Sequence, residues 1–220
     1  MENCRVPLII VFAKAPIPSQ VKTRLIPSLG ADAACRLHQA FVEDTLSSLR
    51  ELAVSCDVEL HIDCDLPDWR PGGVSQRLQS SGDLGNRMYV ALSGALKEGR
   101  PAAAILGSDS PTLPLNYVTE LLNSPADICL GPTSDGGFYA ISCRRTDPEM
   151  FAGVEWSTAK TRMQTVAASR LAGLTVGEGS EWYDVDTKED LDRLIADFGL
   201  RPCTQRALMA EGLMPDTHLH

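Results

Sequence analysis

The sequence has 220 residues, of which 44% are hydrophobic, and this suits one α/β domain with a sizeable buried core. A formal net charge of −9 argues against a general surface for nucleic acid or anionic membranes, and no apolar run reaches the roughly 18 residues of a membrane span. Seven cysteines without a C-x-x-C pair disfavour zinc and a disulfide framework, and no signal peptide is recognisable, so we expect a cytoplasmic protein.

The first half of the chain alternates between strand and helix patterns. A continuous apolar run at 6–13 predicts a strand buried on both faces, and a loop rich in proline and lysine follows it. Helical periodicity extends from residue 30 to about 53, and an alternating segment at 57–63 predicts a second strand. A turn then leads into a predicted helix that ends near Gly99.

The second half continues this alternation. Further strands are predicted at 102–107, in two segments within 126–143, and at 174–178; helices are predicted at 115–124, 157–173, 186–199 and, for a last turn, near 203–212. No change of composition suggests a linker. We therefore predict one domain over 1–200, a three-layer α/β/α sandwich with a mostly parallel sheet, and a C-terminal extension over 201–220.

The loop after the first predicted strand, KAPIPSQVKTRL, carries Lys14, Lys22, Thr23 and Arg24. Ligands of open α/β sheets bind beyond the carboxyl ends of the strands, where lysine supplies a point charge and arginine a bidentate fork for phosphate. We predict that this loop binds a diphosphate or triphosphate; the alternative is an ordinary solvated loop. No dinucleotide-binding G-x-G-x-x-G and no P-loop motif is present.

Asp109, in the segment LGSDSP, lies just past another predicted buried strand. A carboxylate there can be a turn residue or can bind Mg²⁺, which takes one or two carboxylates together with substrate phosphates. Next to a phosphate-binding loop, the metal is the favoured interpretation.

The segment WYDVDTKEDL predicts a helix that is capped by Asp186 or Thr187, with an acidic residue three positions on completing a capping box. Asp184 and Asp186 could also offer a second metal ligand. The helix predicted further upstream, at 157–173, has Ser157 as its candidate N-cap.

Two glycine-containing segments complete the candidate site. In SDGG, Gly136 and Gly137 allow unusual φ angles and a close approach of the backbone to a ligand beside Asp135. In GDLGNRM, Asp83 and Arg87 lie one helical turn apart, either as a surface ion pair or at the lip of a pocket.

Six segments occur in order: FAKAPIPSQVKTRL, SGDLGNRM, LGSDSPTLP, LGPTSDGGFYAI, WST and DVDTKEDL. Together they resemble a bacterial family of glycosyltransferase-like proteins with the GT-A, or nucleotide-diphospho-sugar transferase, fold. The resemblance covers roughly residues 6–198, and the chain is similar, more distantly, to 2-phospholactate guanylyltransferases and molybdenum-cofactor guanylyltransferases. The segments are specific for the family and much less so for a reaction.

The resemblance implies that the first loop binds the phosphates of a nucleotide, with Lys22 and Arg24 at the basic positions of the family and Lys14 at the start of the loop. It implies that Asp109 binds the metal and that Asp186 makes a second metal contact. One departure is visible, because members of the family usually have glycine where this chain has Ser19.

The resemblance also places Asp135, Gly136 and Gly137 on the acceptor side. Trp156, with the serine and threonine that follow it, matches a family segment without an assigned role, and we expect it to be a packing residue. Asp83 and Arg87 are grouped with the nucleotide-binding residues.

We therefore expect a transferase that depends on Mg²⁺ or Mn²⁺ and acts on a nucleotide-activated substrate, with Asp109, Lys22 and Arg24 stabilising the charge of the leaving group. Glycosyl transfer from an NDP-sugar to a small-molecule acceptor is favoured, because the family is usually described so. Nucleotidyl transfer with release of pyrophosphate is the main alternative. A non-catalytic nucleotide-sugar-binding protein is the third hypothesis, and the departure from the family at Ser19 is the feature that suggests it. We expect no nucleic-acid partner, and the oligomeric state is open.

Overall fold

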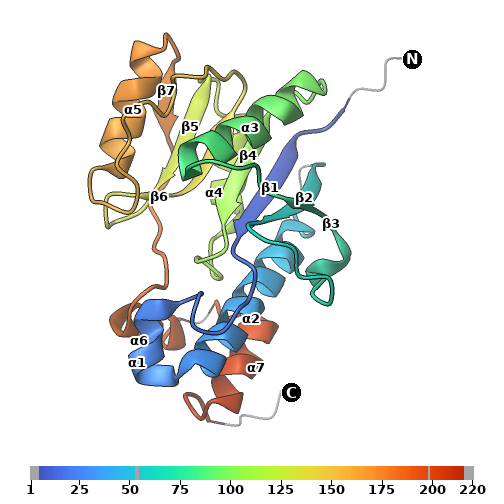
Figure 1. Ribbon diagram of the computed structural model, residues 1–220, viewed down its shortest axis with the longest axis vertical. Coiled ribbons are helices and arrows are strands. Elements are labelled where there is room, and N and C mark those ends of the chain that lie inside the picture. Colours follow the sequence, from blue (N-terminus) through green and yellow to red (C-terminus); the bar gives the residue numbers. More distant parts are fainter. Residues whose placement is uncertain (1–4, 53–54, 198, 216–220) are drawn as a thin grey trace.

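Within residues 5–52, 55–197 and 199–215, which the computed structural model describes, seven strands form one sheet in the order β3-β2-β1-β4-β6-β5-β7 (Figure 1). The strands are β1 (Leu8–Ala13), β2 (Asp57–Ile62), β3 (Ser75–Leu78), β4 (Ala103–Gly107), β5 (Ile128–Pro132), β6 (Phe138–Cys143) and β7 (Val176–Glu178). Only β6 runs antiparallel to its neighbours, β4 and β5. The prediction of a mostly parallel sheet is confirmed.

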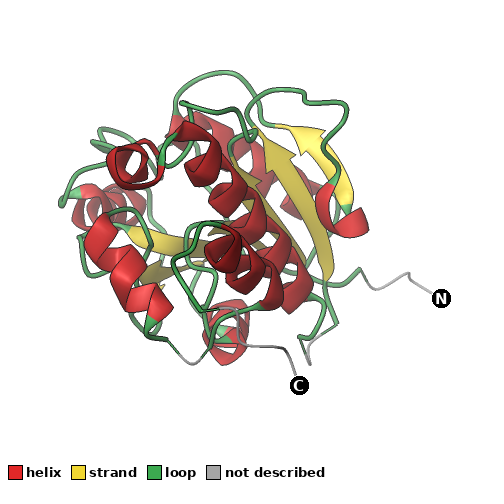
Figure 2. Cartoon of the chain, turned by 90° about the horizontal axis from the view of Figure 1, so that it is seen from below, coloured by secondary structure: helices red, strands yellow, loops and turns green. Residues whose placement is uncertain are grey.

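The helices cover both faces of this sheet (Figure 2). They are α1 (Ile26–Leu29), α2 (Ala31–Leu49), α3 (Leu84–Lys97), α4 (Leu115–Asn123), α5 (Thr161–Leu171), α6 (Lys188–Ile195) and α7 (Pro202–Ala210), with 3₁₀ turns η1 (Thr23–Leu25) and η2 (Pro71–Gly73). On β1, Ile9 and Val11 pack with α2 and α4, whereas Leu8 and Ile10 pack with α3. The apolar run is therefore buried on both faces, as a central parallel strand requires.

A third apolar cluster lies apart from the sheet. Helices α1, α6 and α7 gather around the first half of α2, at the bottom of Figure 1. The buried residues of this cluster include Leu25 of η1, Phe41 of α2, Leu191 of α6 and Leu208 of α7, and α1 packs on them with partly buried side chains. This cluster anchors the chain after the loop that follows β1, and it brings the start of α6 close to that loop.

Two local predictions need correction. Strand β3 is not predicted by the sequence pattern, because SQRL is polar and mostly exposed and is held at the sheet edge through its pairing with β2. Helix α5 begins at Thr161 with Lys160 as its N-cap, so the prediction of Ser157 as the cap is wrong. Ser157 has a φ of 61°, a left-handed conformation instead of the extended one that N-caps adopt.

The described part of the chain contains no helix that is long and apolar enough to cross a membrane. Helix α7 packs directly on α2. The division into a domain over 1–200 and an extension over 201–220 stays a prediction, and its last residues, 216–220, lie outside the described residues.

Candidate active site

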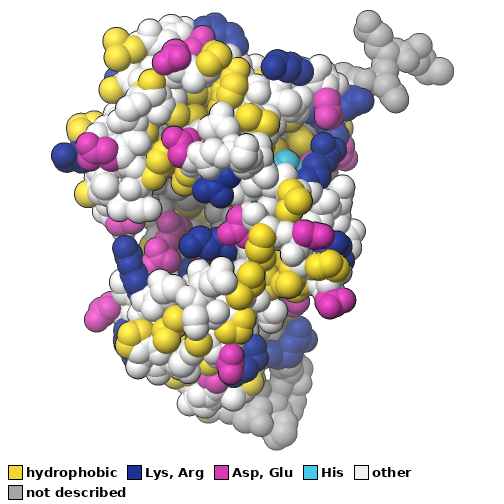
Figure 3. Space-filling view, viewed as in Figure 1, with side chains coloured by type: hydrophobic (Ala, Val, Ile, Leu, Met, Phe, Trp, Pro, Cys, Tyr) yellow, Lys and Arg dark blue, Asp and Glu magenta, His cyan; other side chains and the backbone are white. Residues whose placement is uncertain are grey.

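A hollow of about 840 Å³ lies beyond the carboxyl ends of the central strands. Lys14 directly follows β1, Asp63 follows β2, and Asp109 lies two residues past β4, and all three line it. The turn from β5 to β6 reaches the same edge of the sheet and contributes Asp135. In Figure 3 the hollow is the shaded gap at the left, where basic and acidic side chains meet. This is the place where open α/β sheets bind ligands.

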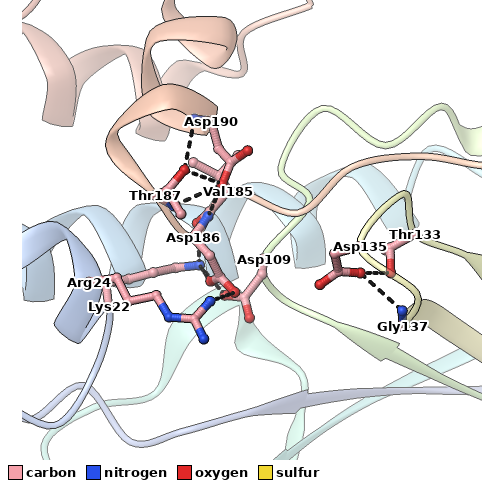
Figure 4. Close-up of polar contacts among 10 residues, drawn as sticks. All are labelled: Lys22, Arg24, Asp109, Thr133, Asp135, Gly137, Val185, Asp186, Thr187 and Asp190. Carbon is pink, nitrogen blue, oxygen red and sulfur yellow. Dashed lines mark hydrogen bonds and ion pairs between the residues drawn. The ribbon is translucent and has the colours of Figure 1, made fainter. Parts of the chain in front are cut away.

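The ammonium group of Lys22 occupies the centre of the polar side of this hollow (Figure 4). Its Nζ lies 2.5 Å from Oδ1 of Asp109 and 3.2 Å from Oδ1 of Asp186, and it donates to the carbonyl oxygen of Val185 at 2.7 Å. The side chain is only 3% exposed, and Nζ lies 5.3 Å from the ring centre of Phe41. The structure thus brings two segments that lie far apart in the sequence, at Asp109 and at 185–186, to the buried ammonium group of Lys22.

Lys22 and Asp109 stabilise each other's charged forms. Burial acts to lower the pKa of Lys22, but the nearby carboxylates of Asp109 and Asp186 outweigh burial and raise that pKa above its ordinary value. Burial acts to raise the pKa of Asp109, and the charge of Lys22 outweighs it and holds that pKa below the ordinary value.

Strained backbone occurs at two residues that line the hollow, Lys22 and Ser157, and at Ser19 next to its lining. Ser19, Lys22 and Ser157 have φ angles of 68°, 46° and 61°, and in the described part of the chain no other non-glycine residue has a positive φ. Left-handed conformations cost free energy for residues with a Cβ and persist where the surrounding structure enforces them, often at functional sites. Ser19 therefore adopts a left-handed conformation for which glycine is better suited.

The segment before α6 brings two aspartates to the hollow. The amide of Val185 donates to the carbonyl oxygen of Asp109 at 2.8 Å, which ties this segment to the end of β4. Thr187 is the N-cap of α6 and forms a reciprocal capping box with Asp190, one of the two predicted arrangements. Because Thr187 caps the helix, the carboxylate of Asp186 is available to Lys22.

Asp184 is held beside the cluster by a hydrogen bond from Oγ of Ser110, at 2.6 Å. It lines the hollow, and burial, reinforced by the charge of Asp109, raises its pKa to about 7. On this side of the hollow two carboxylates, those of Asp109 and Asp186, thus contact one ammonium group. Arg24 lies at the rim, where its Nη1 is 4.0 Å from Oδ2 of Asp186 and its side chain is 69% exposed.

The opposite wall is the turn between β5 and β6. Oδ1 of Asp135 accepts hydrogen bonds from Oγ1 of Thr133 at 2.5 Å and from the amide of Gly137 at 3.0 Å, which fixes the carboxylate at the edge of the hollow (Figure 4). Gly136 lies behind this wall with a φ of 89°, and a Cβ there would come within 2.7 Å of the carbonyl carbon of Ala159. The turn and the segment after Trp156 therefore touch backbone to backbone.

Trp156 both packs and lines the hollow. Its ring makes edge contacts with Phe138 and Phe151, with centroid distances of 6.4 and 5.6 Å, which agrees with the expected packing role. Met88 and Ile105 also line this side, which makes it more apolar than the side that carries Lys22.

The remaining predicted residues differ in their placement. Lys14 and Thr23 are exposed at the hollow, and Lys14 forms no ion pair within the described residues. Arg87 lines the hollow and donates to Oε1 of Gln79 at 2.8 Å. Asp83 does not line it: its carboxylate caps α3 by accepting from the amide of Asn86, and it forms no ion pair with Arg87 in the described structure.

Sequence reasoning missed three residues of the hollow. Nε2 of His38, a buried residue of α2, donates to the carbonyl oxygen of Lys14 at 2.9 Å, and burial lowers the pKa of this histidine. Oδ1 of Asp63 accepts from the amide of Ala15 at 2.7 Å, and Gln79 links the end of β1 to Arg87. The sequence could have indicated Asp63, because this residue ends a predicted strand just as Asp109 follows one. No sequence pattern pointed to His38.

The fold and the position of the hollow define a protein of the nucleotide-diphospho-sugar transferase class of folds. A solved structure from Desulfovibrio desulfuricans G20, described provisionally as a nucleotide-diphospho-sugar transferase, is 31% identical, with a TM-score of 0.82, and the match covers 93% of this chain and 96% of that one. This likeness confirms the resemblance found in the sequence.

The chain belongs to the bacterial family DUF2064, described as "Uncharacterized protein conserved in bacteria", whose family model matches residues 37–158. A CMP:2-keto-3-deoxy-manno-octonic acid synthetase solved with CTP shares the fold at 12% identity and a TM-score of 0.54, over 94% of this chain and 99% of that one. A cytidylyltransferase from Leptospira borgpetersenii serovar Hardjo-bovis (strain JB197) also shares the fold, at 12% identity and a TM-score of 0.54, and the match covers 99% of this chain and 100% of that one. No curated protein matches the sequence.

Proposed function

We propose that the protein is a metal-dependent transferase that uses a nucleotide-activated substrate, and that it transfers a glycosyl group from an NDP-sugar to a small-molecule acceptor. The observation that carries this proposal is the convergence of Lys22, Asp109 and Asp186 in a hollow at the carboxyl ends of the parallel strands. The relative from Desulfovibrio desulfuricans, at 31% identity over nearly the whole chain, supports it.

The phosphates would lie against the loop after β1. Lys14 and Arg24 extend exposed cationic side chains at the hollow, and Thr23 adds a hydroxyl donor. Lysine and arginine make charge-assisted hydrogen bonds to phosphate oxygens, and these strengthen as negative charge builds on the leaving group. Arg87, across the hollow, is a further candidate for the phosphates or the ribose.

The donor set suits a hard divalent cation. Oxygens of Asp109 and Asp186 already converge on one cation, the ammonium group of Lys22, so the two carboxylates are close enough together to share a metal. The described residues contain no cluster of three or more acidic, histidine or cysteine ligands, and Mg²⁺ typically combines one or two carboxylates with substrate phosphates. When bound, Mg²⁺ or Mn²⁺ would neutralise charge on the diphosphate.

The acceptor would enter from the side of Asp135. One oxygen of its carboxylate is held by the turn, and the group is well placed to accept a hydrogen bond from an acceptor hydroxyl. Gly136 and Gly137 keep this turn tight, and Trp156 supplies an apolar wall beside it.

Nucleotidyl transfer with release of pyrophosphate is the second candidate. Four cationic side chains line the hollow, Lys14, Lys22, Arg24 and Arg87, enough for a triphosphate. Product analysis separates the two reactions, since glycosyl transfer releases a nucleoside diphosphate and nucleotidyl transfer releases pyrophosphate. A non-catalytic nucleotide-sugar-binding protein, the third candidate, would have no turnover to lose.

The decisive experiment is a calorimetric screen of the common NTPs and NDP-sugars with Mg²⁺ and with Mn²⁺. We expect one nucleotide or nucleotide sugar to bind in the presence of metal, and Asp109→Asn to abolish turnover of that compound. A purified, folded protein that bound none of them would rule the proposal out. Glu98→Gln, a change on the far end of α3 outside this hollow, is the matched control for loss of one carboxylate.

A further inference from the structure

We propose that Lys22 is a resident cation that keeps the Asp109–Asp186 site closed to divalent metals until a nucleotide binds. The inference rests on the proposed function and adds a regulatory step to it: metal and nucleotide must arrive together, because only phosphate oxygens can draw the ammonium group away.

The contacts of Lys22 are those of a bound cation. An ammonium group has three N–H donors, and three oxygens surround this one: Oδ1 of Asp109, Oδ1 of Asp186 and the carbonyl oxygen of Val185, at 2.5, 3.2 and 2.7 Å. With the side chain only 3% exposed, solvent has little access to Nζ. No contact is left over with which Lys22 could hold a phosphate while it stays in this position.

A metal and Lys22 cannot hold these oxygens at the same time. A divalent cation shared by the two carboxylates would sit about 2.0–2.6 Å from their oxygens, in the space that Nζ now fills. The two positive charges would also repel each other at this short range. The site therefore has two alternative occupants.

The surroundings favour an exchange of cations over simple release. If Lys22 left without a replacement, the like charges of Asp109 and Asp186 would stay uncompensated in a partly buried site. Phosphate oxygens in the hollow would offer the ammonium group a new partner as strong as the old one. The left-handed backbone at Lys22, with a φ of 46°, is a strained conformation of the kind that occurs at functional sites and in segments that switch.

Binding of Mn²⁺ to the nucleotide-free protein tests this directly, by electron paramagnetic resonance of the free ion. Lys22→Met keeps the length of the side chain and removes its charge. Lys14→Met removes the same charge from the same hollow but from a residue that forms no ion pair with the described carboxylates. We expect Lys22→Met to bind Mn²⁺ at least about tenfold more tightly than wild type, and Lys14→Met, whose charge acts on Asp109 without an ion pair, to gain much less than Lys22→Met.

A folded Lys22→Met variant that binds Mn²⁺ no more tightly than wild type overturns the proposal, and so does an equal gain in Lys14→Met. If Lys22→Met is unfolded without metal, Mn²⁺ must restore its folding, since a ligand of the native state stabilises it; failure to do so also overturns the proposal. The proposed function fails separately, when wild type binds no nucleotide with metal present.

Discussion

The substitution Gly136→Ala should lower the stability of the protein through one specific backbone contact. Gly136 has a φ of 89°, and the added Cβ would lie within 2.7 Å of the carbonyl carbon of Ala159 and closer still to its oxygen. The opposing atoms belong to the backbone, so no side-chain rotation relieves the clash. The segment after Trp156 would have to move away from the turn that carries Asp135.

The magnitude has two parts. A left-handed φ costs a residue with a Cβ about 1–2 kcal/mol, and forcing an extra methyl group into a packed contact costs about 1–3 kcal/mol. Gly153→Ala is the matched control, because Gly153 has a φ of 70° and a Cβ added there would meet no atom within 4 Å. Gly153→Ala should lose only the stability that corresponds to the left-handed φ. The effect of alanine on the unfolded chain is common to both variants and cancels in the comparison.

The difference between the two variants therefore isolates the contact between the two loops. We expect Gly136→Ala to be less stable than Gly153→Ala by about 1–3 kcal/mol, or roughly 2–12 °C in Tm for a chain of this size. Thermal unfolding followed by circular dichroism measures it. Equal Tm values for the two variants would refute the reasoning and show that the turn and the Trp156 segment can separate without cost.

Three further predictions concern the opposite side of the hollow. Because Ser19 already has a φ of 68°, Ser19→Gly should keep its stability within about 1 kcal/mol, whereas the β-branched Ser19→Val should lose about 1–2 kcal/mol more in urea unfolding. Lys22 holds the pKa of Asp109 below its value in the unfolded chain, so the pair stabilises the fold above about pH 4, and this contribution is lost as the pH falls further. The urea concentration at the midpoint of unfolding should therefore fall less on acidification in Asp109→Asn than in wild type. An equal fall in both proteins would contradict the pairing. Thr187→Ala removes one side of the capping box with Asp190 and should cost about 1 kcal/mol, or roughly 2–4 °C in Tm, whereas an unchanged Tm would mean that the cap does not hold α6.

Much of the fold followed from local patterns in the sequence. The apolar run that became β1 is buried on both faces, which only a central strand requires, and the small apolar run before Asp109 became β4 beside it. Parallel strands align their carboxyl ends, so residues that follow separate strands, such as Lys14 and Asp109, could be expected at one edge. The structure places both in the same hollow.

The rest depended on interactions that no local pattern records. Strand β3 has no apolar face and exists through its pairing with β2, so its sequence carries no hydrophobic signal. The left-handed φ of Ser157 is imposed by its surroundings, against the usual preference of serine for helix caps. His38 looked like an ordinary helix residue and became part of the hollow because α2 passes beneath the end of β1.

The sequence by itself determined the class of fold, the edge of the sheet at which the hollow lies and the types of charge gathered there, because strand burial and the order of the elements follow from local residue patterns. Only the tertiary structure decided that Lys22 lies between Asp109 and Asp186. That pairing joins residues up to 164 positions apart, and it depends on how the cluster of α1, α2 and α6 packs. Residue spacing cannot record such a contact, and it turns a predicted phosphate-binding lysine into the cation that holds the two carboxylates together.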